Sequence, residues 1–183
     1  MHLLIISLII ILTFINGCSK TNSSNLPVSA VEHFYKTYLT NRTGGLPYGH
    51  TLEELRPFLS DNLYHLIIEA LEYQKRFIAL HPDEPSSSGG PAVIYKPPFI
   101  DDDYFSSLFE GPKSFKVIKT EAGPNGSFLV HVQFVYDQSV TAWEDVIIVI
   151  KQRGVYVIDD VIYSGAGDFN PKGRLSDRLS INF

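Results

Sequence analysis

The chain has 183 residues, of which 44% are hydrophobic and 19% are charged. These values are typical of a globular protein and exclude a wholly disordered chain. The formal net charge is −5, and no cluster of lysine or arginine residues is present. Nonspecific nucleic-acid binding requires such a cluster to neutralise phosphates, so the composition argues against a nucleic-acid partner.

The N-terminal segment contains the one strongly hydrophobic run, LLIISLIIILTFI at 3–15. As a helix it would be about 20 Å long, short of the roughly 30 Å hydrocarbon core of a bilayer. The run is therefore interpreted as the apolar region of a signal peptide over 1–17, although no Lys or Arg precedes it. The residues that follow, Ile15-Asn16-Gly17-Cys18, resemble the bacterial lipobox. This resemblance implies cleavage after Gly17 and acylation of Cys18.

The lipobox resemblance also implies a location in the bacterial cell envelope, with the membrane contacted through the acylated Cys18. Ser19 stands where an Asp would, in enteric bacteria, indicate inner-membrane retention, so we expect the outer membrane, facing the periplasm. Cys18 is the only cysteine, which excludes an intramolecular disulfide. Residues 18–27 are polar and predict a flexible tether with a reach of about 17 Å.

Two helices are predicted near the start of the mature chain. Apolar residues recur at helical spacing over 28–39, and Ser29 with Glu32 fits a capping box. A second, short helix is expected to start at Thr51 and to end at Pro57.

A third and longer helix is predicted from Ser60, as its N-cap, to His81. The segment 82–103 is rich in Pro, Ser and Gly and predicts a long loop, within which 92–95 could form a short edge strand. Residues 103–111 are interpreted as a helical turn or two that ends at a glycine.

The last third of the chain predicts a sheet. Apolar residues alternate along 128–136, and the short links before 146–150 and 155–163 favour antiparallel neighbours. A further strand is predicted over 115–120. Because 146–150 is apolar on both faces, it is interpreted as a central strand that is covered on both sides. The fold class is therefore α+β, with N-terminal helices packed on a curved antiparallel sheet of four to five strands.

Two adjacent acidic residues, Asp159 and Asp160, interrupt the last long strand. Neighbouring side chains in a strand point to opposite faces, so one of these carboxylates is expected to be buried. An unpaired buried carboxylate is costly, and that residue is expected to have partners.

Two short motifs and the order of elements carry a family resemblance. The motifs are V-x-x-F-Y-x-x-Y-L at 31–39 and F-S-S-L-F-E-G at 105–111. The chain resembles a functionally uncharacterised family of bacterial envelope lipoprotein domains with the cone-shaped fold named after nuclear transport factor two. The resemblance implies one domain over 28–164, with a cavity at the wide end of the cone, followed by a tail over 165–183. It brings no catalytic residues.

Residues suited to catalysis or metal binding are sparse. The acidic run 101–103 with Glu110 lacks the turn glycine of a calcium loop, so no metal site is predicted. His131 is the one candidate general base, with Asp137 or Asp159 as its possible partner. No nucleophile elbow, P-loop, zincin or C-x-x-C motif occurs. We therefore expect no cofactor and no catalytic residues.

Aromatic residues in or near the loop and the sheet are the candidate ligand-binding or partner-binding residues, namely Tyr95, Phe99, Tyr104, Tyr136 and Trp143. The sequence thus favours a non-catalytic envelope lipoprotein that binds a protein partner or a small ligand. One alternative is an immunity-type lipoprotein that neutralises a periplasmic toxin. The other is an enzyme with His131 as a general base in the cavity.

Overall fold

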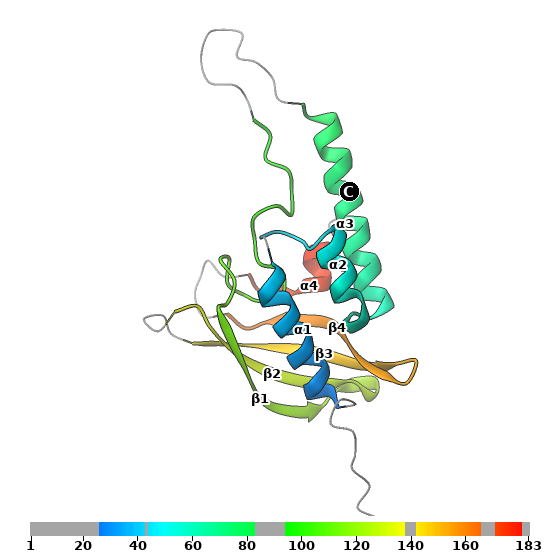
Figure 1. Ribbon diagram of the computed structural model, residues 1–183, viewed down its shortest axis with the longest axis vertical. Helices are drawn as coiled ribbons and strands as arrows, with labels where there is room; N and C mark the ends of the chain where they lie inside the picture. Colours follow the sequence, from blue (N-terminus) through cyan, green and yellow to red (C-terminus); the bar gives the residue numbers. More distant parts are fainter. Residues whose placement is uncertain (1–25, 43, 83–93, 138–141, 166–170, 181–183) are drawn as a thin grey trace, which may run out of the picture.

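The computed structural model describes residues 26–42, 44–82, 94–137, 142–165 and 171–180. The signal peptide predicted at 1–17 lies outside these ranges, and so does the tether predicted at 18–27 except for its last two residues, of which Pro27 begins the first helix. The fold is α+β, with three helices followed by an antiparallel sheet (Figure 1). The helical elements are α1 (Pro27–Asn41), α2 (Gly49–Leu55), η2 (Arg56–Phe58), α3 (Asp61–Leu80), η3 (Pro124–Gly126) and α4 (Leu175–Leu179). The strands are β1 (Ser114–Ala122), β2 (Phe128–Val135), β3 (Trp143–Gln152), β4 (Val155–Tyr163) and β5 (Gly173–Arg174).

The sheet is a meander in which each strand pairs with the next in sequence, in the order β1-β2-β3-β4-β5. All four pairings are antiparallel, which confirms the predicted arrangement and adds the short β5. Helix α1 contacts β1, β2, β3 and β4 and so crosses one face of the sheet (Figure 1). We call this the helix-covered face and the opposite one the open face.

The third helix forms as predicted, because its start signal is local. The Ser60 side chain accepts a hydrogen bond of 3.0 Å from the Leu63 backbone N–H, which satisfies one of the free N–H groups of the first turn. The capping box predicted at Ser29 is wrong. Helix α1 begins at Pro27, a residue favoured in the first turn, so Ser29 lies inside the helix and contacts His33 instead.

The hydrophobic core lies between the helices and the helix-covered face. Aromatic residues of α1 fill much of it: the Tyr35 ring lies 5.0 Å from that of Phe134 and the Phe34 ring 4.8 Å from that of Phe105. Leu175 of α4 is fully buried, so the segment after β5 packs back on the body. Burial of such a side chain contributes about 1.5–3 kcal/mol.

A β-bulge in β4 separates the two acidic residues of that strand. Ile148 pairs with Asp160 and Val149 with Ile158, which leaves Asp159 as the extra residue. Asp160 is buried, with 5% of its surface exposed, whereas Asp159 is half-buried. One carboxylate is therefore buried, as expected. The expectation that the two face opposite sides of the sheet is wrong, because the bulge lets both line one pocket on the open face.

The strand β3 differs from its prediction. On the helix-covered face Ile147 and Val149 are fully buried, but on the open face Val146, Ile148 and Ile150 are half-buried. The described residues thus cover β3 completely on one face, although its sequence is apolar on both.

The second half of α3 extends beyond the sheet together with the segment that follows the long loop (Figure 1). We call residues 71–82 and 94–98 the arm. The buried residues of α3, Leu63, Ile67 and Ala70, all precede it. Residues 83–93 lie outside the described ranges, and so does part of the edge strand predicted at 92–95. Ile94 and Tyr95 are not in a strand.

Candidate functional site

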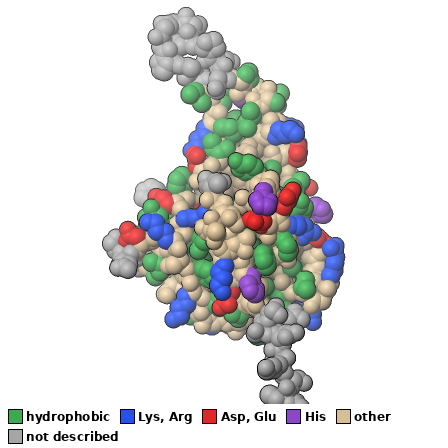
Figure 2. All heavy atoms as spheres, viewed as in Figure 1, with side chains coloured by type: hydrophobic (Ala, Val, Ile, Leu, Met, Phe, Trp, Pro, Cys, Tyr) green, Lys and Arg blue, Asp and Glu red, His purple; other side chains and the backbone are tan. Residues whose placement is uncertain are grey.

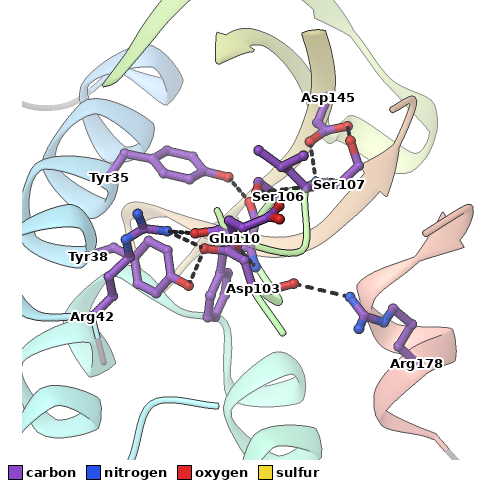
Figure 3. Close-up of polar contacts among 11 residues, drawn as sticks. Tyr35, Tyr38, Arg42, Asp103, Ser106, Ser107, Glu110, Asp145 and Arg178 are labelled. Carbon is purple, nitrogen blue, oxygen red and sulfur yellow. Dashed lines mark hydrogen bonds and ion pairs between the residues drawn. The ribbon is translucent and has the colours of Figure 1, made fainter. Parts of the chain in front are cut away.

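The motif at 105–111 belongs to a loop that contacts both α1 and β3 (Figure 3). The predicted helical turn over 103–111 is wrong, because bends and a turn replace it. Asp103 organises the loop: its Oδ1 accepts the backbone N–H of Phe105 at 2.9 Å. Its Oδ2 accepts from the Tyr38 hydroxyl at 2.9 Å and from Arg42 Nη1 at 3.1 Å.

A second buried carboxylate, Asp145 of β3, holds the other side of the same loop (Figure 3). It accepts the backbone N–H of Ser107 at 2.8 Å and the Ser107 hydroxyl at 2.7 Å. The Ser164 N–H donates to it at 2.9 Å and the Trp143 indole N–H at 3.3 Å. Four donors converge on one carboxylate, so little hydrogen-bonding capacity remains for a ligand.

Helix α4 closes the network through Arg178, whose guanidinium lies 4.3 Å from the centre of the Tyr104 ring. Arg178 donates to the Asp103 carbonyl at 3.2 Å and to Asp102 Oδ2 at 2.6 Å. The Tyr163 hydroxyl donates to the Tyr104 carbonyl at 2.7 Å. The loop is therefore fixed by four elements far apart in the sequence, α1, β3, β4 and α4.

Burial shifts the acid–base properties of this network. Desolvation raises the pKa of Asp103 and of Asp145, and the hydrogen bonds they accept oppose that rise. Burial also raises the pKa of Tyr38 well above its usual value and that of Tyr104 to about 12, so both phenols stay neutral. Among the described residues no buried side-chain nitrogen or oxygen lacks a partner. We conclude that the network is structural.

His131, the candidate base, lies on the open face and not in the helix-covered interior. Its Nδ1 lies 2.6 Å from Glu144 Oε1, and its Nε2 lies 3.7 Å from Glu121 Oε1. The partner predicted for His131, Asp137 or Asp159, is therefore wrong, because cross-strand register places His131 beside β1 and β3. Sequence spacing alone could not reveal this register.

The five aromatic candidates do not form one surface. Trp143, Phe99 and Tyr104 belong to the core, with exposed fractions of 7%, 6% and 5%. Tyr136 is half-buried under the Lys113 ammonium group, 4.5 Å from its ring centre. Tyr95 is 39% exposed and lies in the arm. Of the five, Tyr95 is therefore the most accessible to a partner.

Each carboxylate of the acidic run at 101–103 has a basic partner. The pairs are Asp101 with Lys96, Asp102 with Arg178 and Asp103 with Arg42. Within the described ranges no group of three or more His, Cys, Asp or Glu residues is placed to hold a metal ion. In the same part of the chain no helix combines the length and the apolar character that crossing a membrane requires.

Clefts lie outside the packed interior. One of about 420 Å³ separates the α2–α3 junction from the β3–β4 hairpin, and Arg56 and Arg153 both pair with Asp61 there. A second, of about 300 Å³, opens beside Arg42 and Asp103. A third, of about 320 Å³, lies on the open face.

Comparison with known proteins adds no relative: no family model, curated protein or solved structure matches this chain.

Proposed function

We propose that this chain is a lipid-anchored protein of the bacterial cell envelope that works by binding a protein partner through its arm. The observation that carries the proposal is a group of large apolar side chains exposed on the arm. The group comprises Ile78, Leu80, Ile94 and Tyr95, with exposed fractions of 52%, 75%, 73% and 39%. Clustered exposed apolar residues on a soluble domain are typical of an interaction site.

The charges of the arm distinguish it from an ordinary solvated helix end. The arm contains one acidic residue, Glu72, whereas Lys75 and Arg76 are exposed beside the apolar group. Figure 2 shows hydrophobic side chains along the arm, with Lys or Arg side chains among them. This pattern fits a partner that offers an apolar groove with an acidic rim.

The two segments of the arm are held together before any partner arrives. Gln74 Nε2 donates to the Pro98 carbonyl at 2.6 Å. At the end of α3 the His81 ring stacks on Phe77 at 4.2 Å and lies 5.2 Å from the Tyr95 ring. A surface that is already organised loses less conformational entropy on binding.

The position of the arm fits an anchored protein. The N-terminal end of α1 and the far end of α3 lie at opposite ends of the long axis (Figure 1). Acylation of Cys18 would hold the first of these ends near the membrane. The arm would then point away from that membrane, into the aqueous space where a periplasmic partner is found.

Photo-crosslinking in the native host tests the arm. A photoreactive amino acid replaces Leu80 or Ile94 in the full-length chain, and Tyr48, which is 65% exposed, serves as the matched control on the body. We expect the same protein adduct from both arm positions and none from Tyr48. The partner identified in this way, once purified, should bind the wild-type chain and lose about tenfold in affinity for Ile78→Asp.

Equal adducts from Tyr48, adducts with lipid alone, or unchanged affinity for Ile78→Asp would refute the arm as the binding surface. An adduct with a toxin would make the partner the one that the immunity-type alternative requires.

The anchor has its own test. Cys18→Ser should move the protein from the membrane fraction to the soluble fraction without changing its melting temperature, because Cys18 precedes the folded domain. Intact mass of the native protein should show an acylated Cys18, and an unmodified cysteine would contradict the proposal.

A further inference from the structure

The open face carries a pocket that the arm does not involve. Its floor is formed by aliphatic side chains of three neighbouring strands, namely Leu129 of β2, Ile148 and Ile150 of β3, and Ile162 of β4. Three adjacent strands span two spacings of roughly 4.8 Å each. The volume of about 320 Å³ lies at the lower end of the range for small-molecule sites.

The floor is more apolar than an exposed sheet face usually is. An antiparallel sheet that faces water normally alternates apolar and polar side chains, with the polar ones outward. Here Ile148 and Ile150 lie on the open face of the central strand, are half-buried, and line the pocket together with Pro124 and Asn125 of η3. The pocket has an apolar floor because β3 carries apolar side chains on both faces.

Two carboxylates at the rim of the pocket differ in their pairing. Asp160 accepts the Ser176 N–H at 3.0 Å and the Ser176 hydroxyl at 2.7 Å, and it lies 3.6 Å from Arg174 Nη1. Asp159, which the β-bulge sets apart, makes no hydrogen bond or ion pair with any residue that the structure describes. One uncompensated negative charge therefore stands beside an aliphatic floor.

We propose that this pocket binds a small alkylammonium compound, with its aliphatic chain on the floor and its cationic nitrogen at Asp159. Burial of the chain supplies affinity, at about 25 cal/mol per Å² of apolar surface. The half-buried carboxylate supplies selectivity for a cation, because an anion placed there would be repelled and a neutral head group would gain no ion pair. The inference is independent of the proposed partner, since the arm lies elsewhere.

Calorimetric titration tests the pocket on the full mature chain, held in nanodiscs of zwitterionic lipid. The probes are n-hexylamine, n-hexanol and hexanoate, which share the aliphatic chain and differ in charge. The heat from empty nanodiscs is subtracted for each probe. We expect n-hexylamine to bind about three- to fivefold tighter than n-hexanol, and hexanoate to bind weakest.

Two variants assign the selectivity. Asp159→Asn should bring n-hexylamine to the affinity of n-hexanol, whereas Glu144→Gln, an exposed carboxylate of the same face outside the pocket, should leave the preference intact. Unchanged melting temperatures show that both variants fold. The inference is overturned if wild type binds no probe, if hexanoate matches n-hexylamine, or if Asp159→Asn keeps the preference.

Discussion

Two carboxylates on opposite faces of the sheet differ in how they are held. On the helix-covered face Asp145 is fully buried and accepts four hydrogen bonds that hold the 103–111 loop. On the open face Asp159 is half-buried and has no partner among the described residues. The buried Asp145 is therefore committed to the fold, as is the buried Asp160, which accepts hydrogen bonds from Ser176, whereas Asp159 is not. The binding surfaces are better sought where polar groups remain unpaired or apolar groups remain exposed.

The largest expected effect separates these two carboxylates directly. Asp145→Ala removes the acceptor for four donors, and we expect it to lower the free energy of unfolding by about 3–5 kcal/mol. Asp159→Ala should change it by no more than about 0.5 kcal/mol. Urea denaturation of both variants at neutral pH measures the difference. Similar losses for the two variants would abolish the distinction between the two carboxylates.

A smaller effect is expected at the other end of the buried network. Tyr38→Phe removes the hydroxyl that donates to Asp103 Oδ2, while the Arg42 and Phe105 donors remain. We expect a loss of about 1–3 kcal/mol, because the buried carboxylate loses one of its hydrogen bonds. Chemical denaturation gives this value as well. A neutral substitution would mean that the Tyr38 hydroxyl does not stabilise the loop.

The fold could be predicted where it depends on interactions between residues close in the sequence. Helix α3 and the strands β2, β3 and β4 follow from local patterns, and the Ser60 cap spans three residues. The 103–111 loop could not be predicted in the same way. Its conformation depends on hydrogen bonds from Tyr38 and to Asp145, which lie 65 and 38 residues from their partners. The local sequence alone favoured a helical turn, and the distant partners override it.

The candidate sites show the same limit. His131 was identified by its chemistry, but its face and its partner Glu144 depend on strand register. Trp143 was identified as a large apolar surface, yet its ring packs 5.7 Å from that of Phe134 in the core. The arm leaves a weak signal in the sequence, because 73–82 and 94–100 lack acidic residues. Its exposure becomes evident only in the fold.

A substitution of His131, on the open face, should change the free energy of unfolding less than the substitutions of Asp145 and Tyr38 in the buried network. Its carboxylate neighbours Glu144 and Glu121 have side chains that are 46% and 48% exposed, so solvent screens both contacts. His131→Ala should therefore alter the free energy of unfolding by less than about 1 kcal/mol. Urea denaturation measures it. A loss as large as that of Tyr38→Phe would show that the contacts of His131 with Glu144 and Glu121 also stabilise the fold.

The smallest expected effect concerns pH and the partly exposed Asp61 at the start of α3. The hydrogen bond from Arg56 is the main cause that lowers the pKa of Asp61, and Arg153 adds to it. The folded state therefore binds fewer protons than the unfolded chain once the pH approaches about 3.9, the usual pKa of an aspartate. The stabilisation by Asp61 is fully present above that value and is lost as the pH falls through the folded pKa. Asp103 and Asp145 should show the opposite pH dependence. Burial raises their pKa values, so their contribution to the free energy of unfolding decreases as the pH rises.

Asp61→Asn isolates the contribution of this single carboxylate. The difference in free energy of unfolding between wild type and Asp61→Asn should be constant from pH 8 to about pH 5 and should shrink below about pH 4. Urea denaturation at several pH values, at one ionic strength, measures it. Asp159→Asn is the matched control, because Asp159 has no described partner and its removal should leave the acid limb of the curve unchanged. A difference that stays constant down to pH 3 would mean that Asp61 is not paired in the folded protein.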